Sequence, residues 1–313
     1  MNVGFIGLGT MGAHMARHVQ NALKPGSDQL VVHDLRRVAA EPHLAQGATW
    51  AATPRPVAQN CDVIFTSLPG PAEVEAVVAG ADGLLSGVRS TAAYFDLSTN
   101  SPSLVRRLHK EFLARGAHML DAPVSGGPEG AASGKLALWV GGDEAVFNKH
   151  FGLLATIGDQ AKYIGPIGAG TVAKLVHNCA GYVINTALAE VFALGVKAGV
   201  EPLDLWQAVR QGALGRRRTF DQLTAHFLPG MYDPARFSLR LAHKDVGLAV
   251  ALGRELGVPM RLANLALEEM TEAMNRGWGD RDSRIAMTLE LERAGVTIKV
   301  DPERLRAAAT DQS

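Results

Sequence analysis

The chain has 313 residues, of which 47% are hydrophobic and 20% are charged, and its formal net charge is zero. This length predicts about two globular domains, and zero net charge gives no general attraction to nucleic acid or to a membrane surface, so we expect neither as a partner. The two cysteines, Cys61 and Cys179, lack metal-ligand spacing and are typical of buried thiols in a reducing compartment, which favours a cytoplasmic protein without a metal site.

The first element is a short apolar run, Val3–Ile6, which predicts a buried parallel strand directly after Met1 and leaves no room for a signal peptide. A helix is expected over about Met11–Leu23. Between them lies a G-x-G-x-x-G loop of Gly7, Leu8, Gly9, Thr10, Met11 and Gly12. Its glycines permit a tight turn, close approach of a pyrophosphate, and close packing of helix on strand. Free N–H groups at the helix start would bind the phosphates, so this stretch predicts a dinucleotide site.

A second strand, Leu30–His33, ends in Asp34. An acidic residue about 20 positions beyond the glycines suits a ribose 2′-hydroxyl and would repel the 2′-phosphate of NADP, so NAD is favoured. Arg36 and Arg37 follow and could hold that phosphate, which keeps NADP possible. The alternative for Asp34 is a helix N-cap.

Further strands are expected over Asp62–Ser67, Tyr94–Leu97 and His118–Ala122, each followed by a turn. Ligands of doubly wound sheets bind beyond the carboxyl ends of the strands. We therefore expect the three turns to converge on one crevice, although each is compatible with a plain turn; they are Leu68-Pro69, Ser98-Thr99 and Pro123–Gly127. Strands over Lys135–Val140 and Ala161–Ile164, and helices capped by Ser101 and Asp143, complete this half.

The segment Asp121–Gly127 carries a candidate carboxylate site. Ser125 offers a hydroxyl, and Gly126 and Gly127 offer backbone N–H groups that no side chain obstructs. Such a group of donors suits a carboxylate. The alternative is a glycine turn chosen for its backbone geometry.

The segment Gly165–Gly199 predicts a helix over about residues 169–198, roughly 45 Å long. Lys174 and Asn178 lie one turn apart and share a face of it. A lysine near a helix start opposes the helix dipole by about 0.3–1 kcal/mol, so a solvated Lys174 is the alternative to a functional one. Asn185 and Glu190 interrupt the most apolar part, which disfavours a membrane span.

Beyond this helix the apolar periodicity is helical only, which predicts a Rossmann-type α/β domain followed by an all-α domain and joined to it by a long spine helix. We place the domains at residues 1–165 and 166–296, with a tail at 297–313. A second subunit would cover the apolar helix faces, so a homodimer or homotetramer through the helical domain is expected. The expected helices are Leu203–Gln211, Arg218–Ala225, Leu239–Leu256, Arg261–Asn275 and Ser283–Arg293.

From Val3 to about Arg293, the chain resembles the β-hydroxyacid dehydrogenase family, which includes 3-hydroxyisobutyrate dehydrogenase and tartronate semialdehyde reductase. Four motifs in order carry the resemblance: Gly7–Ala16, Asp121–Gly127 followed by Gly130-Ala131 and Gly134, Gly168–Asn178, and Lys244-Asp245. The Asp34-Leu35 pair stands where NADP-type relatives have Asn-Arg, which again favours NAD.

The resemblance implies a role for each matching residue. Lys174 would be the general acid/base, and Asn178 would orient the substrate. Ser125, Gly126 and Gly127 would bind the substrate carboxylate. Thr99 and Lys244 would lie near the nicotinamide and its ribose, Leu68 and Pro69 would line the cofactor site, and Phe237 would cover the cofactor. His177 would either contact the substrate or pack against the cofactor domain, and Arg216–Arg218 would be either a solvated helix end or a clamp for an anionic substrate group.

These residues predict reversible hydride transfer between NAD and the carbinol carbon of a small 3-hydroxyacid. Burial would lower the pKa of the lysine toward the working pH, where a base is most effective. Three alternatives remain: a decarboxylating 6-phosphogluconate dehydrogenase, whose helical half is much longer; an imine reductase, which typically lacks the lysine; and a dinucleotide-binding or assembly module without turnover.

Overall fold

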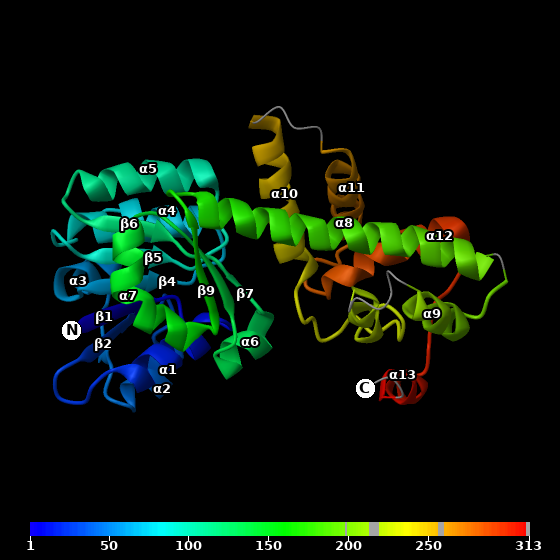
Figure 1. The fold of residues 1–313 in the computed structure, drawn as a ribbon, viewed down its shortest axis with the longest axis horizontal. Coiled ribbons are helices and arrows are strands. Elements are labelled where there is room, and N and C mark those ends of the chain that lie inside the picture. Colours follow the sequence, from blue (N-terminus) through cyan, green and yellow to red (C-terminus); the bar gives the residue numbers. More distant parts are fainter. Residues whose placement is uncertain (198, 213–218, 256–259, 311–313) are drawn as a thin grey trace. The chain divides into compact units, whose positions relative to one another are not determined.

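The computed structural model describes residues 1–197, 199–212, 219–255 and 260–310 (Figure 1). The chain divides into two compact units, Met1–Val176 (unit 1) and His177–Ser313 (unit 2). The long helix α8, Ala169–Lys197, belongs to both units, so this division falls inside the helix. The boundary expected from the sequence, between residues 165 and 166, lies just before it.

Unit 1 is built on a nine-stranded sheet with the order β3-β2-β1-β4-β5-β6-β8-β7 and with β9 paired to β8. Strands β3 to β6 along this order are parallel, whereas β8 runs antiparallel to β6 and β7. The strands are β1 Asn2–Ile6, β2 Gln29–His33, β3 Thr49–Trp50, β4 Val63–Thr66, β5 Ala93–Asp96, β6 His118–Asp121, β7 Val124–Ser125, β8 Ala137–Gly141 and β9 Gln160–Gly165.

Helices cover both faces of this sheet (Figure 1). Because successive strand residues point to opposite faces, Phe5 packs in the core on the side of α1 and α7, and its neighbour Ile6 packs on the side of α3, α4 and α5. Both side chains are buried, as expected for a parallel sheet covered on two sides. The helices are α1 Gly12–Ala22, α2 Glu41–Leu44, α3 Pro54–Asn60, α4 Pro71–Ala79, α5 Pro102–Leu113, α6 Gly127–Ser133 and α7 Glu144–Ile157, with 3₁₀ turns η1 Arg37–Ala40 and η2 Leu84–Ser86.

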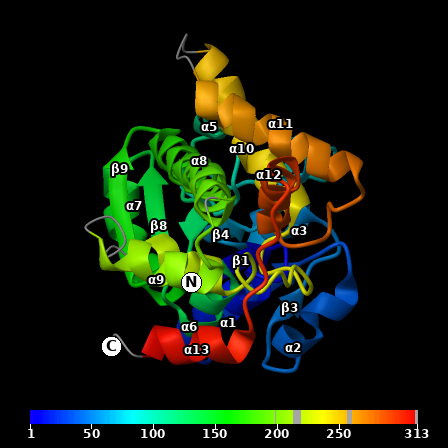
Figure 2. The same cartoon turned by 90° about the vertical axis from the view of Figure 1, so that its right-hand side faces the viewer.

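All the named elements in the described part of unit 2 are helices or 3₁₀ turns, joined by loops (Figure 2). Its core joins Leu188 and Phe192 of α8 to Trp206 of the next helix and to apolar residues near the C-terminus. A separate pair, α10 and α11, packs side by side. The elements are α9 Pro202–Gln211, η3 Thr219–Thr224, α10 Leu239–Glu255, α11 Arg261–Asn275, η4 Ser283–Met287, α12 Thr288–Ala294 and α13 Pro302–Thr310.

The predicted fold class, a Rossmann-type domain and a helical domain joined by a long helix, is confirmed. The helix caps are confirmed too: the Ser101 side chain accepts from Leu104 N, and that of Asp143 accepts from Ala145 N and Val146 N. Strands β3 and β7 and helix α6 were not predicted, because two-residue strands and a glycine-rich seven-residue helix leave little periodic pattern.

Two helix predictions in unit 2 need correction. Over Arg218–Ala225 the structure has a 3₁₀ turn, η3, and Arg216–Arg218 lie outside the described residues. Over Ser283–Arg293 a 3₁₀ turn precedes α12, because buried Asp282 accepts from Arg284 N and tightens the first turn. In the segment expected as a tail, Pro302–Thr310 form α13, and Leu305 packs in the core with Ile298 and Val300. None of the described helices has the length and hydropathy that crossing a membrane requires.

Candidate active site

The glycine loop follows β1, at the point where the strand order of the sheet reverses between β1 and β4. Gly7 has a φ of +90°, and a Cβ there would lie 2.3 Å from the Ser67 carbonyl oxygen. A Cβ on Gly12 would lie 1.9 Å from the Gly7 carbonyl oxygen. Both positions therefore require glycine for packing, whereas a Cβ on Gly9 would meet nothing within 4 Å. Open space over the middle glycine is what a bound pyrophosphate needs.

The N-terminus of α1 fits an anion as well. Its N-cap residue, Met11, makes no side-chain cap hydrogen bond, and its first turn contains no acidic residue. By contrast, α5, α7 and α9 are capped by the side chains of Ser101, Asp143 and Glu201. A helix start without a capping side chain has N–H groups and a positive dipole end for phosphate.

Asp34 follows β2 and lies beside this loop. One carboxylate oxygen accepts from Leu8 N at 2.7 Å, and the other accepts from Arg36 N at 2.8 Å. Leu35, the next residue, is 96% exposed, and the Arg37 guanidinium lies 5.9 Å from the Trp50 ring centroid. The Asp34 side chain thus ties the end of β2 to the glycine loop; it does not act as the N-cap of η1, whose N-cap residue is Arg36.

The ends of β4 and β5 are joined through Leu68 and Ser98. Leu68 N donates to Ser98 Oγ at 2.9 Å. Below them, the buried Asp96 carboxylate accepts from Thr66 Oγ1, Ser98 N and Asn100 Nδ2 at 2.8–3.0 Å. Burial raises the pKa of Asp96, and these donors oppose that rise. The network holds two predicted cofactor segments, Leu68-Pro69 and Ser98-Thr99, in register; Thr99 is partly exposed and Pro69 is exposed.

The predicted carboxylate loop has a well-defined conformation. Ser125 lies in β7 and pairs with Ala137 of β8. Gly126 and Gly127 have φ values of +140° and +64°, and a Cβ on Gly127 would meet nothing within 4 Å. Gly126 is the N-cap residue of α6, which makes no side-chain cap hydrogen bond. The loop therefore presents an open glycine, as the glycine loop after β1 does, but unlike α1 the first turn of α6 contains an acidic residue, Glu129.

Lys174 lies in the second turn of α8 and is only 9% exposed, so the alternative of a solvated lysine is wrong. The start of α8 is held by Asp121, at the end of β6, whose carboxylate accepts from Gly168 N at 2.7 Å and from Thr171 N at 2.5 Å. Burial raises the pKa of Asp121, and these two backbone donors oppose that rise.

In unit 2, Asn178 lies one turn beyond Lys174 on α8. Its Nδ2 donates to Asp245 Oδ2 of α10 at 2.6 Å. The Nζ of Lys244 lies 2.9 Å from the other oxygen of the same carboxylate. Asp245 is 2% exposed, so Asn178 and Lys244 meet at one buried anion.

Two other predicted residues of unit 2 have defined places. The Phe237 ring stacks on Tyr182 of α8, with centroids 6.5 Å apart. The side chain of His177 is exposed. Arg216–Arg218 lie outside the described residues, so their predicted roles remain predictions.

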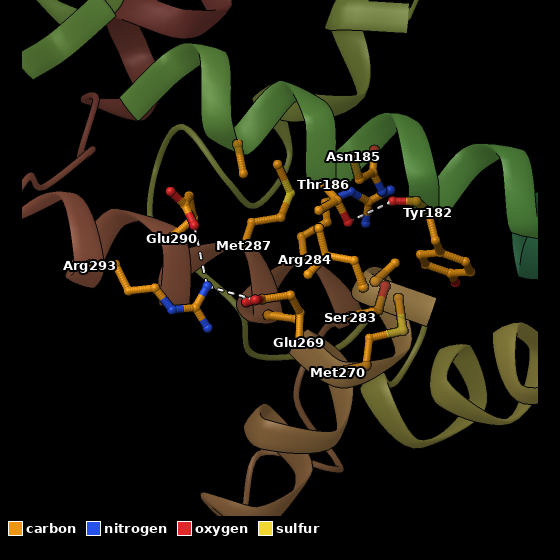
Figure 3. A pocket seen from close by; sticks show the side chains of 14 residues that line it. Tyr182, Asn185, Thr186, Glu269, Met270, Ser283, Arg284, Met287, Glu290 and Arg293 are labelled. Atoms are coloured by element: carbon orange, nitrogen blue, oxygen red, sulfur yellow. Dashed lines mark hydrogen bonds and ion pairs between the residues drawn. The ribbon is translucent and has the colours of Figure 1, made fainter. Parts of the chain in front are cut away.

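Unit 2 also contains a pocket of about 190 Å³ between α8, α11, η4 and α12 (Figure 3). Arg293 on its rim lies 2.6 Å from Glu269 and 3.2 Å from Glu290. Asn178 and Lys244 are not among its lining residues. No group of three metal-ligating side chains occurs among the residues that the structure describes.

Asp121 and Asp245 belong to motifs recognised in the sequence, but neither residue was predicted to have a role. A signal for Asp245 exists, because it stands on the buried face of α10 with Leu239, Ala242, Val246 and Ala249. A carboxylate at such a position requires a polar partner. For Asp121 no local signal exists, because its donors lie 47 and 50 residues further along the chain.

The fold and these sites define a dinucleotide-binding protein with a helical second unit. Two known family models match the chain, one over each of its two parts. Residues 2–165 match the model described as the NAD-binding domain of 6-phosphogluconate dehydrogenase, and residues 168–289 match the one described as the NAD-binding part of NADP-dependent 3-hydroxyisobutyrate dehydrogenase.

Individual relatives span almost the whole chain. It is 34% identical to 2-(hydroxymethyl)glutarate dehydrogenase of Eubacterium barkeri, over 95% of this chain and 97% of the relative. It is also 34% identical to NAD-dependent L-serine dehydrogenase of Pseudomonas aeruginosa, over 92% and 97%. The crystal structure of 3-hydroxyisobutyrate dehydrogenase from Salmonella typhimurium superposes with a TM-score of 0.78 at 31% identity, covering 92% and 99%.

The chain therefore belongs to the β-hydroxyacid dehydrogenase family of NAD(P)-dependent oxidoreductases. The resemblance seen in the sequence, the enzyme class and the nicotinamide cofactor are confirmed.

Proposed function

We propose that this protein catalyses reversible hydride transfer between NAD and the hydroxyl-bearing carbon of a small 3-hydroxyacid, with Lys174 as general acid/base. The observation that carries the proposal is the 9% exposure of Lys174 near the start of α8, in the unit that also holds the glycine loop and the Ser125–Gly127 loop. Burying an ammonium group is costly, and a functional role for it is the simplest physical reason to retain one there.

The residues around the glycine loop fit NAD. Gly7, Leu8, Gly9, Thr10, Met11 and Gly12 would hold the pyrophosphate, since Gly9 faces open space and α1 has no capping side chain. Asp34 would accept from the ribose hydroxyls and repel a 2′-phosphate. Leu68, Pro69, Thr99 and Lys244 would contact the nicotinamide half. When bound, the nicotinamide accepts or returns the hydride.

The remaining residues would act on the substrate. Ser125, Gly126 and Gly127 would bind its carboxylate through a hydroxyl and backbone N–H groups, supported by the open space over Gly127. Asn178, held by Asp245, would orient the hydroxyl or carboxylate. During oxidation Lys174 would take the hydroxyl proton, and during reduction its ammonium would return it.

The names of the relatives suggest the substrate class. The three dehydrogenases compared above are named for 2-(hydroxymethyl)glutarate, L-serine and 3-hydroxyisobutyrate. In each of these compounds a CH₂OH group is attached to the carbon that bears a carboxylate. We propose the same arrangement for the substrate of this chain. A second anionic or polyhydroxylated group is the specific expectation, because Arg216–Arg218 are candidates for a clamp on an anionic substrate group.

The test is an initial-rate panel that follows nicotinamide absorbance with NAD and, in parallel, with NADP. It contains 3-hydroxyisobutyrate, L-serine, glycerate, threonate, 2-(hydroxymethyl)glutarate and a sulfonated analogue, with a cyclic imine plus reduced cofactor as the imine-reductase arm. Turnover of one acid, higher with NAD, supports the proposal. Turnover of the imine alone, or tight dinucleotide binding without turnover of any compound, would contradict it.

We also propose that the protein is a cytoplasmic homodimer or homotetramer associated through unit 2. Its support is the exposed apolar surface of that unit, which includes Ile184 on α8 and Leu262 and Leu265 on α11 at 37–56% exposure. Cys61 and Cys179 are buried free thiols, as suits a reducing compartment. Light scattering after size exclusion should give two or four chains per particle; a monomer at micromolar concentration would contradict the assembly.

A further inference from the structure

The start of α8 is anchored by a side chain from a distant strand. Asp121, at the end of β6, is 1% exposed, and its two oxygens accept from Gly168 N and Thr171 N. The first N–H groups of a helix have no partner within the helix and are usually satisfied by a neighbouring residue or by water. Here the acceptor comes from 47 residues earlier in the chain.

The start of α8 packs closely against β8 and against Asp121. A Cβ on Gly170 would lie 2.0 Å from the Trp139 carbonyl oxygen, and a Cβ on Gly141 would lie 2.5 Å from Asp121 Oδ1 and 2.9 Å from Ala169 N. The first turn of α8 therefore packs against the backbone of β8, and the Asp121 carboxylate lies beside this contact. Such packing leaves the helix start little freedom to shift.

The charge of Asp121 also suits its place. A carboxylate at a helix N-terminus interacts favourably with the helix dipole and makes charge-assisted hydrogen bonds to N–H groups. The same dipole end disfavours the ammonium of Lys174, three residues beyond Thr171 and about 4.5 Å further along the axis. An anion at the helix start offsets that repulsion.

Asp121 is linked to the other half of the proposed site by the chain itself. Ser125 follows it by four residues, through buried Ala122 and Pro123. Asp121 thus precedes the Ser125–Gly127 loop in the chain, and its side chain binds the first turn of α8, which comes just before Lys174.

We infer that Asp121 is a positioning residue that holds the first turn of α8, and with it Lys174, in a fixed place relative to the Ser125–Gly127 loop. This inference rests on the proposed function for its catalytic consequence, although the anchoring itself can be tested without turnover.

The kinetic test is Asp121→Asn, which keeps the shape but turns an acceptor oxygen into an N–H₂ group facing a backbone donor. The matched control is Asp143→Asn, which replaces the carboxylate at the N-cap of α7 in the same unit by an amide whose oxygen can still accept from Ala145 N and Val146 N. Because displacement by about 1 Å can cost about 100-fold in rate, kcat per folded Asp121→Asn enzyme should fall about 10- to 100-fold. The NAD dissociation constant should stay within about twofold, and Asp143→Asn should keep its kcat. Equal kcat values for both variants and wild type would overturn the inference.

The second test reads Lys174 directly. Reductive methylation of the folded proteins, quantified at Lys174 by mass spectrometry, should be about tenfold faster in Asp121→Asn than in wild type or Asp143→Asn. Reaction of the buried Cys61 thiol with a disulfide reagent reports general loosening of unit 1 and should not change. Unchanged Lys174 labelling, or an equal rise at Cys61, would overturn the inference. If wild type oxidises no acid, the proposed function fails, while this comparison still decides whether Asp121 anchors Lys174.

A third measurement needs no variant and covers the case in which Asp121→Asn does not fold. In wild type, the amide hydrogens of Gly168 and Thr171 should exchange with solvent as slowly as those of β6, because both N–H groups are bonded to a buried carboxylate. Exchange of these amides as fast as at an exposed helix start would contradict the anchoring.

Discussion

The two units hold their proposed site residues by different physical means. In unit 1 the proposed dinucleotide loop is shaped by close backbone packing: Gly7 and Gly12 approach other backbone atoms so closely that a side chain would collide. In unit 2 the site residues belong to separate helices and meet through side chains, Asn178 of α8 and Lys244 of α10 at the Asp245 carboxylate. The glycine spacing that such backbone packing requires is visible within a few residues of sequence, whereas the side-chain pair joins residues 67 positions apart.

The largest expected effect separates packing from binding within the glycine loop. In Gly12→Ala the new Cβ would lie 1.9 Å from a backbone oxygen that cannot move away cheaply, so the free energy of unfolding should fall by about 4 kcal/mol. In Gly9→Ala the new Cβ meets nothing within 4 Å, so stability should stay within about 0.5 kcal/mol of wild type. NAD binding by Gly9→Ala should weaken about tenfold or more, because the methyl group occupies the space proposed for the pyrophosphate.

Urea unfolding and NAD titration of the two variants provide the measurements. A stable Gly12→Ala protein, or a Gly9→Ala protein that binds NAD as wild type does, would show that the loop is not built as described.

A smaller effect concerns acid stability in unit 1. Burial lowers the pKa of His150 on α7 to about 4 from its ordinary 6.5. Between these two values the unfolded chain binds a proton that the folded chain does not, so stability is fully present above about pH 6.5 and is lost as the pH falls toward 4. The loss attributable to this group is about 3 kcal/mol over the whole window.

Comparison of wild type with His150→Gln by urea unfolding at pH 7 and pH 5 measures this contribution. The variant should lose less stability than wild type between the two pH values. An identical pH dependence would mean that His150 is not buried in its neutral form.

The smallest expected effect tests the side-chain contact of unit 2. Asn178→Ala and Asp245→Ala should each destabilise the protein, and the double variant should lose less than the sum, by about 1–2 kcal/mol, because the hydrogen bond to a charged acceptor is counted twice in the single variants. A double-mutant cycle by urea unfolding gives this coupling energy. Additive losses would show that the two side chains do not stabilise each other. Val176→Ala, at an exposed position of the same helix, is the control for a change without coupling.

The same contrast explains what the sequence could predict. The loop from Gly7 to Gly12, Asp34, the strand ends and the long helix follow from spacing within a few tens of residues, and the fold they imply is confirmed. The buried partners of Asn178 and of the first turn of α8 come from α10 and β6. A carboxylate on the buried face of α10 indicates that Asp245 has a partner, but pairing over such distances leaves no pattern that identifies the partner. The 3₁₀ turn η4 was predicted as a helix because its apolar spacing fits both, and the hydrogen bonds to Asp282 decide between them.

Lys174, buried near the start of α8, is proposed to exchange the proton of the substrate hydroxyl. The most direct test is the kcat of Lys174→Ala against wild type, with the best acid of the panel and NAD. A thermal unfolding curve and an NAD titration should show that the variant is folded and binds the cofactor. We expect the kcat of Lys174→Ala to be about 10²–10⁴-fold below that of wild type, with unchanged NAD affinity. Undiminished turnover in a folded Lys174→Ala protein would contradict it.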